Sequence, residues 1–154
     1  RLIELRREHP VFRRRRFLAG GALGDDEHDR EIAWLTPECT LMTQDDWNTP
    51  FGRALMVFLD GDAIAEPDAR GQRVVDDSFL LMFNAHYEDI DFTVPGADFG
   101  DEWEVVVDTT QARGVREDAA PVPSGGTVTV GQRSTVVLRR TQPPAGEGNV
   151  EANL

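Results

Sequence analysis

The stretch DDSFLLMFNAHYE, residues 76–88, is the most apolar part of a very acidic chain, and it runs directly into Asn84, His86 and Glu88. Such a polar cluster is either a catalytic constellation or the place where a core strand reaches the surface. In a strand, Asn84 and His86 lie on one face with Cα atoms about 6.8 Å apart, too far for an ordinary direct hydrogen bond between neighbouring side chains. We therefore favour a structural role over ligand contact, with each side chain bonded to a partner of its own.

Two charged stretches suggest ion binding. The run DDEHDRE, residues 25–31, offers oxygen ligands and His28 to a cation such as calcium, but it lacks the Asp-x-Asp-x-Asp-Gly spacing, so we expect a solvated loop. The run RRRRF, residues 13–17, suits a phosphate, although pairing with acids of this chain or of a neighbouring domain is the commoner arrangement. Cys39 has no histidine at a suggestive spacing, and no serine stands in a Gly-x-Ser-x-Gly elbow. We predict no nucleophilic catalysis, no metal and no cofactor.

The three tryptophans have different neighbours. Trp103 alternates with valines and is expected in the core, whereas Trp34 and Trp47 are flanked by polar residues. Exposed rings of this kind either stack on the C–H faces of sugars or pack against a neighbouring domain. Trp47 falls in a predicted short helix, because Thr43 and Asp46 precede it at capping-box spacing. We take Trp34 and Trp47 as candidate substrate-binding residues.

Length and composition restrict the class of protein. The 154 residues suffice for one domain with a real core, and a hydrophobic share of 40% excludes a disordered chain despite the net charge of −12. After the arginine-rich residues 1–17 the chain is strongly acidic, which argues against nucleic acid as a partner. The longest apolar run, residues 54–59, is far short of the roughly 20 residues of a membrane span. The single cysteine indicates a reducing compartment, so we expect a cytoplasmic protein.

The opening residues, RLIELRREHPVF, predict a helix that Pro10 stops, with Leu2, Leu5 and His9 on one side. No capping residue precedes this helix, and Arg1 already belongs to the helical pattern. A helix has this appearance when the sequence starts close to the end of an upstream domain, so that the residues that would cap the helix are left out. We therefore interpret the chain as the C-terminal piece of a larger protein.

After this region the apolar pattern changes to the period of two that is typical of strands. Residues 53–60 are apolar on both faces, which predicts a central strand, and the odd positions of residues 77–85 predict an unbroken core stripe. Residues 90–94 and 103–109 alternate more cleanly, and a closing hairpin is predicted around Gly131. The polar positions expected to face water are Asp91, Thr93, Glu104 and Asp108.

Short strands at this spacing predict a mainly β fold, an antiparallel β-sandwich. Residues 111–126 are expected to form a long loop. We divide the chain into a helix and linker at 1–17, the sandwich at 18–140, and a flexible tail at 141–154 that has almost nothing to bury.

Four blocks of sequence follow one another in a characteristic order: LIELRREHPVFRRRRF, EIAWLTPECTLMTQDDW, DDSFLLMFNAHYEDIDFTVP and WEVVVDT. Together they resemble the C-terminal part of bacterial glycogen debranching enzymes of the isoamylase type, over roughly residues 2–109. The resemblance implies that the N-terminal helix is left over from the last helix of a preceding α-amylase-type (β/α)8 barrel, and that a β-sandwich packs against this barrel. Cys39 stands where relatives often carry the glycine of an Asp-Gly turn.

The resemblance also implies a parent glycoside hydrolase that cleaves α-1,6 branch linkages of glycogen or limit dextrin with retention, in glycogen catabolism. Retaining chemistry needs a carboxylate nucleophile and an acid about 5–5.5 Å apart. The segment with Gly114, Arg116 and Asp118 imitates the Gly-x-Arg-x-Asp pattern of the family's nucleophile. In the family this Asp ends a buried barrel strand, whereas here Glu117 interrupts the apolar pattern and a Pro- and Gly-rich segment follows. The family's other barrel motifs have no counterpart, so we assign no catalytic residue to this chain.

We therefore expect a non-catalytic domain whose partner is its own upstream barrel, in an enzyme that acts on α-glucan. A second hypothesis is an α-glucan-binding sandwich that uses Trp34 and Trp47, and a third is a domain that joins subunits into a homo-oligomer. Titration with maltoheptaose, followed by Trp fluorescence, distinguishes the first two. Light scattering tests the third.

Overall fold

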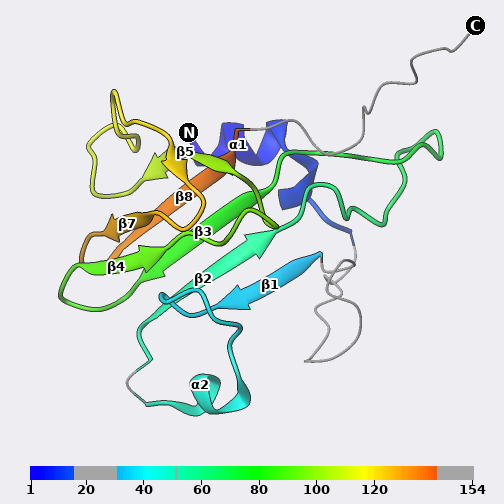
Figure 1. Cartoon of the computed structure of the whole chain (residues 1–154). Helices are drawn as coiled ribbons and strands as arrows, with labels where there is room; N and C mark the ends of the chain where they lie inside the picture. Colours follow the sequence, from blue (N-terminus) through cyan, green and yellow to red (C-terminus); the bar gives the residue numbers. More distant parts are fainter. Residues whose placement is uncertain (16–30, 51, 142–154) are drawn as a thin grey trace, which may run out of the picture.

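A computed structural model of the chain describes residues 1–15, 31–50 and 52–141. This part is mainly antiparallel β-structure (Figure 1). The larger sheet has the spatial order β1-β2-β3-β8-β5-β6, and the smaller sheet pairs β4 with β7. The strands are β1 (Ile32–Leu35), β2 (Ala54–Leu59), β3 (Phe79–Asn84), β4 (Ile90–Thr93), β5 (Glu102–Asp108), β6 (Val122–Pro123), β7 (Thr127–Val130) and β8 (Ser134–Arg140). The helical segments are α1 (Leu2–Glu8), the 3-10 helix η1 (Pro10–Phe12) and α2 (Gln44–Asn48).

The main core lies between the two sheets. Met56, Leu80 and Trp103 of the larger sheet pack there with Phe92 and Val130 of the smaller sheet, and all five are fully buried. Burying one large apolar side chain contributes about 1.5–3 kcal/mol, so this layer accounts for much of the folding free energy. The predicted antiparallel β-sandwich and the core position of Trp103 are both confirmed.

A second core covers the opposite face of the larger sheet, under α1 and η1. Leu5 and Val11 of the helical segments contact a patch formed by Val57, Phe79 and Val107. Strand β2 therefore contributes side chains to both cores, and it lies between β1 and β3 as the pattern of residues 53–60 predicted.

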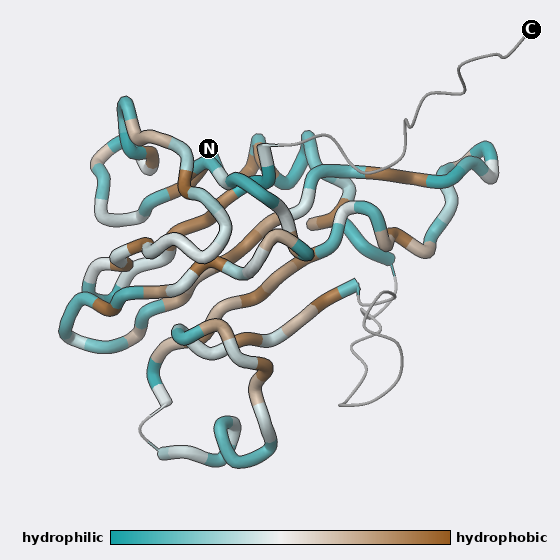
Figure 2. The backbone as a smooth tube through the Cα atoms, viewed as in Figure 1, coloured by the Kyte–Doolittle hydropathy of each residue, from teal (hydrophilic) through white to brown (hydrophobic). Residues whose placement is uncertain are grey.

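The predicted unbroken core stripe on the odd positions of residues 77–85 is wrong. Phe79 is buried under the helical segments, Leu81 is half-buried, and Phe83 is 38% exposed. The fully buried side chains of this strand, Leu80 and Met82, instead face the small sheet. The reason is that α1 and η1 are too short to cover the whole outer face, which leaves its far end open (Figures 1 and 2).

The predicted hairpin around Gly131 is also wrong. Strand β7 pairs with β4, whereas β8 enters the larger sheet between β3 and β5. The turn at Gly131 therefore carries the chain from one sheet to the other. A Cβ atom at Gly131 would lie 2.7 Å from Cγ2 of Thr110, so the crossing passes close to a neighbouring loop. A glycine turn between two stretches of alternating apolar residues occurs both in hairpins and where a chain crosses between sheets. The pattern alone therefore does not distinguish the two.

Asp108 does not face water as predicted. The register of β5 against β8 shifts between Val105 and Val107, and this bulge turns Asp108 inward, where it is fully buried. The other polar positions follow the expectation in part, since Asp91 is exposed while Thr93 and Glu104 are half-buried.

The local signals for helices and loops are largely confirmed. Helix α1 ends at Glu8, before Pro10, and α2 begins with a capping box formed by Thr43 and Asp46. The long loop expected over residues 111–126 contains the two-residue strand β6, which pairs with β5. Within the described residues, no helix combines the length and apolarity needed to cross a bilayer. Most of the predicted acidic loop and all but the first residue of the predicted tail lie outside the described residues.

Candidate functional site

Trp34 and Trp47, the two candidate substrate-binding residues, lie side by side. Their ring centroids are 5.3 Å apart with an interplanar angle of 72°, an edge-to-face contact. Both rings reach the surface, with 39% of Trp34 and 48% of Trp47 exposed. The sequence predicted two separate exposed rings, and the structure brings them into one aromatic pair.

Local hydrogen bonds fix the segment that carries Trp47. Oγ1 of Thr43 accepts from the Asp46 amide at 3.3 Å, and Oδ2 of Asp46 accepts from the Thr43 amide at 2.7 Å. This backbone hydrogen bond from Thr43 lowers the pKa of Asp46 below its ordinary value. The Met42 amide donates to the carbonyl of Trp34 at 2.9 Å, which ties the segment to strand β1.

A groove of about 410 Å³ lies between the α2 segment and the ends of β2 and β3. Trp47 lines it, and Leu55 and Phe83 contribute apolar side chains from the sheet. The exposed residues Glu38 and Arg53 add opposite charges to its wall. Trp34 does not line the groove but supports Trp47 from the neighbouring strand.

Cys39 adopts a left-handed backbone conformation, with φ = 65°, in the turn that leads from β1 toward the groove. Its amide donates to the carbonyl of Thr36 at 2.9 Å. Non-glycine residues rarely adopt this conformation, so the geometry agrees with the glycine expected at this position in relatives. Burial raises the pKa of the Cys39 thiol, which opposes a nucleophilic thiolate.

Asn84 has the structural role that the spacing favoured. It is buried, and its Nδ2 lies 2.8, 3.0 and 3.1 Å from the carbonyl oxygens of Glu88, Val130 and Gly131. Its Oδ1 accepts from the His86 amide at 2.8 Å. Asn84 therefore holds the loop after β3 against the turn after β7. Nδ1 of His86 accepts a hydrogen bond from the Glu88 amide at 3.2 Å, so His86 also stabilises the loop after β3.

The segment that imitates a catalytic motif is an ordered surface loop. Asp118 is exposed, with φ = 56°. Arg116 donates through Nε to Oδ2 of the buried Asp108 and through Nη2 to the carbonyl of Thr129. Although burial favours a raised pKa for Asp108, hydrogen bonds from Arg116 and Thr110 lower its pKa below the ordinary value. These side chains secure the loop to the sandwich.

Within residues 13–15, the described part of the arginine run, Arg14 pairs with an acid of this chain, one of the two outcomes expected for the run. Nη2 of Arg14 pairs with Oε1 of Glu31, and the amide of Arg15 donates to Oε2 of Glu66 at 3.1 Å. The carboxylate of Glu31 also accepts from the amide of Ala65.

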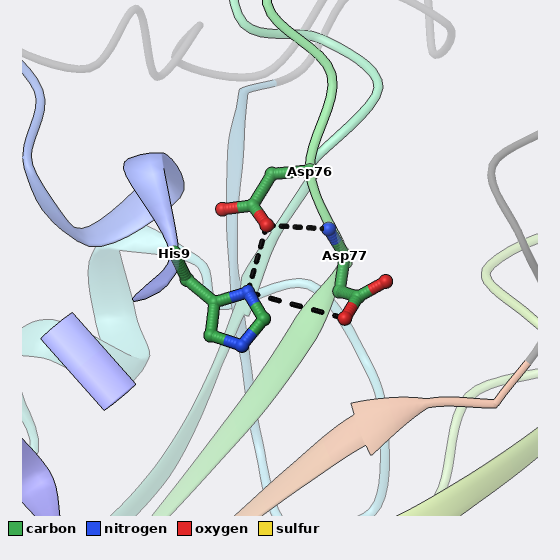
Figure 3. A group of neighbouring side chains, drawn as sticks. All are labelled: His9, Asp76 and Asp77. Atoms are coloured by element: carbon green, nitrogen blue, oxygen red, sulfur yellow. Dashed lines mark hydrogen bonds and ion pairs between the residues drawn. The ribbon is translucent and has the colours of Figure 1, made fainter. Parts of the chain in front are cut away.

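His9, Asp76 and Asp77 form a cluster that the sequence reasoning missed (Figure 3). Nδ1 of His9 lies 2.7 Å from Oδ1 of Asp76 and 3.9 Å from Oδ2 of Asp77. Oδ2 of Asp76 accepts from the Val11 amide at 2.8 Å, and its Oδ1 accepts from the Asp77 amide at 2.8 Å. No local pattern links these residues, because His9 and Asp76 are 67 positions apart.

The same cluster has the composition of a three-ligand metal site, but its environment fits a structural contact better. Both oxygens of Asp76 already accept hydrogen bonds, and Nη1 of Arg139 lies 3.7 Å from Oδ2 of Asp77. A cation placed there would meet this guanidinium. We call the His9–Asp76 contact, with the Val11 amide, the N-terminal clasp, since it fastens the α1–η1 segment to the start of β3.

The fold and these contacts define a β-sandwich domain with an aromatic groove beside α2. The family described as "Isoamylase, C-terminal" matches residues 31–139, and the chain belongs to this family. The resemblance drawn from the four sequence blocks is therefore confirmed.

Named relatives agree with this membership. The chain is 47% identical over 137 residues to the glycogen operon protein GlgX homologues of Mycobacterium bovis and Mycobacterium tuberculosis, which covers 89% of this chain. It spans only 19% of the length of those relatives. The crystal structure of type I pullulanase from Bacillus subtilis, complexed with maltose, shares the fold with a TM-score of 0.50 and 19% identity, over 92% of this chain and 15% of that protein.

Proposed function

We propose that the chain is the non-catalytic C-terminal domain of a cytoplasmic glycogen debranching enzyme. In this proposal residues 1–17 end an upstream (β/α)8 barrel, residues 18–140 form the supporting sandwich, and residues 141–154 are a tail. The barrel hydrolyses α-1,6 linkages in glycogen or limit dextrin. Membership of the isoamylase C-terminal family supports the proposal, as does the 19% share of the GlgX homologues that the chain spans.

The exposure pattern of α1 is the observation that carries the proposal. Leu5 is buried against the larger sheet, but Leu2 and Ile3 are 60% and 76% exposed. Adjacent large apolar side chains at the surface of a short helix favour contact with a further protein segment. A barrel joined to α1 would cover Leu2 and Ile3 from the side that the sheet leaves open.

The N-terminal clasp gives the sandwich a means to orient this helix. Leu5 and Val11 supply apolar contacts, and His9 and Val11 supply polar contacts to Asp76. Because these contacts lie on both sides of Pro10, they fix both the position and the direction in which α1 leaves the domain. The sandwich therefore acts as a brace for the barrel's last helix.

Two carboxylates of this domain, Asp46 and Asp108, have properties opposite to those of a glycosidase acid. A retaining glycosidase needs an acid whose pKa is raised, near a second carboxylate that stays ionised. Hydrogen bonds from Thr43 lower the pKa of Asp46, and against the opposing effect of burial, hydrogen bonds from Arg116 and Thr110 lower the pKa of Asp108. Each serves a local hydrogen-bond arrangement, a helix cap for Asp46 and a loop contact for Asp108.

The test uses the double substitution Leu2→Ser and Ile3→Ser in the 154-residue chain and in the longer gene product that contains it. Since both side chains are exposed here, the chain alone should keep its melting temperature within about 2 °C. In the longer protein the same change should lower the melting temperature by about 4 °C or more, because it removes a buried apolar contact. A matched control, Tyr87→Ser, changes an exposed aromatic residue beyond the end of β3 that α1 does not cover, and it should affect neither protein.

Activity provides the second readout. The longer protein should release reducing ends from glycogen, and the 154-residue chain should release none. Equal rates in both would place the chemistry in this domain and contradict the proposal. An unchanged melting temperature of the longer protein with both serines would contradict the bracing role.

A further inference from the structure

We propose that the groove beside Trp47 is a surface site for an α-linked glucose oligomer, in which Trp47 is the stacking platform and Trp34 holds it in place. The inference rests on the proposed function, because that function makes α-glucan the substrate of the parent enzyme. It adds a binding site on the sandwich, away from the barrel chemistry.

The exposure of Trp47 is the first argument. Helix α2 contains no buried residue, and its one aromatic ring is half exposed. A Trp in this position contributes little to a core, yet Trp34 contacts it edge to face at 5.3 Å. An indole held in this way presents a fixed apolar surface of the kind that packs against the C–H face of a pyranose ring.

The orientation of this platform is set before any ligand arrives. The capping box of Thr43 and Asp46 fixes the start of α2, and the hydrogen bond from Met42 to the Trp34 carbonyl fixes the segment that precedes it. A site with few conformations to lose on binding gains affinity, because ordering its side chains costs free energy.

The polar groups of the groove favour a neutral polyhydroxylated ligand. Glu38 and Arg53 both line it, and neither side chain has a hydrogen-bond or ion-pair partner within residues 1–15, 31–50 and 52–141. A planar carboxylate and a planar guanidinium can each bond two adjacent hydroxyl groups. Since their charges are opposite, an anionic or a cationic ligand would satisfy one of them and oppose the other.

The size of the groove is also suitable. Its volume of about 410 Å³ lies within the range of about 300–1,000 Å³ that small-molecule sites occupy. Leu55 and Phe83 give it apolar walls, and the two charged side chains give it a few polar contacts. This combination is typical of ligand sites, where apolar surface supplies affinity and polar groups supply orientation.

The groove lies at the other end of β2 from the residues that α1 covers. Ala54, the first residue of β2, lines the groove and packs on the core between the sheets, whereas Leu59, the last residue, belongs to the core under α1. Figure 1 shows α1 and α2 at opposite ends of the larger sheet. A barrel attached through α1 therefore leaves the groove accessible to a branched glucan that extends beyond the catalytic site.

The test is a titration of the 154-residue chain with maltoheptaose, followed by Trp fluorescence and by isothermal titration calorimetry. We expect saturable binding with a dissociation constant in the millimolar range or tighter. The substitution Trp47→Ala should weaken binding by about tenfold or more, and Arg53→Gln should weaken it by severalfold. Circular dichroism should show all variants folded, because neither side chain is buried.

Tyr87→Ala is the matched control, since Tyr87 is an exposed aromatic residue that does not line the groove, and its loss should leave affinity unchanged. Cellohexaose, with β-linkages, should bind more weakly than maltoheptaose. Absence of binding at saturating sugar would overturn the site, as would binding that survives Trp47→Ala. Self-association that Trp47→Ala abolishes, without sugar binding, would assign the groove to a second copy of the chain instead. None of these results alters the Leu2 and Ile3 measurements, so the two proposals fail separately.

Discussion

The imidazole of His9 and the carboxylate of Asp76 lie 2.7 Å apart although 67 positions separate them in the chain. Their contact joins the helical N-terminal segment to the first residues before β3. Asp76 also accepts the backbone amide of Val11, so one buried carboxylate satisfies two donors of the N-terminal segment. Asp76 therefore adds a polar attachment to the apolar contacts that Leu5 and Val11 make with the sandwich.

Asp76→Ala should destabilise the chain by about 2–3 kcal/mol, because His9 and the Val11 amide lose their acceptor in a buried environment. Urea denaturation measures the change. Asp77→Ala is the control: its carboxylate is partly exposed and lies 3.9 Å from His9, so we expect less than about 1 kcal/mol. Equal effects of the two substitutions would contradict the clasp.

Phe79→Ala and Phe83→Ala compare two rings on the same face of β3. Phe79 is fully buried under α1 and η1, so its loss should cost about 3–5 kcal/mol. Phe83 is 38% exposed at the uncovered end, and its loss should cost less than about 1.5 kcal/mol. Thermal or urea unfolding of the two variants measures the loss of stability. Equal losses would contradict the finding that α1 and η1 cover Phe79 but not Phe83.

Cys39→Gly should give a more stable protein than Cys39→Ala, by about 1 kcal/mol. Both substitutions remove the thiol, but alanine keeps a Cβ atom in the left-handed conformation and glycine does not. The comparison isolates the backbone contribution from the lost packing of Cys39. If alanine were equal or better, the positive φ would not be a source of strain at this turn.

The ion pair of Asp108 and Arg116 should make stability depend on pH in the acid range. The folded-state pKa of Asp108 is lowered, so its contribution is fully present above the unfolded value of about 3.9 and is lost as the pH falls through the folded-state pKa. The melting temperature of the unmodified chain should therefore exceed that of Arg116→Gln at neutral pH, and the difference should shrink below about pH 4. A difference that stays constant over this range would argue against the pairing.

Much of the fold could be predicted because strand signals are local. The double-faced apolar pattern of residues 53–60, the capping box at Thr43 and the stop at Pro10 depend on residues a few positions apart. The errors arose where distant segments decide the result. The bulge that turns Asp108 inward follows from its pairing with β8, and the crossing at Gly131 depends on which strands β7 and β8 find as partners.

The candidate site was predicted in its residues but not in its arrangement. Polar neighbours indicated that Trp34 and Trp47 reach the surface, and they do. Their contact depends on the turn at Cys39 and the Leu35–Leu41 bridge, which fold the α2 segment back beside β1. The clasp of His9 and Asp76 gave no sequence signal, since neither residue stands in a recognisable motif.

The position of β8 has a consequence for synthesis of the protein on the ribosome. Strand β8 is the last strand of the described chain, yet it lies in the interior of the larger sheet, between β3 and β5. Strands β3 and β5 do not pair with each other, and each pairs with β8. The two parts of the larger sheet therefore cannot be joined until residues 134–140 have left the exit tunnel. We therefore expect a nascent chain stopped before residue 134 to leave the β3 and β5 edges without their shared partner and to be more open to chaperone binding or aggregation than the completed chain.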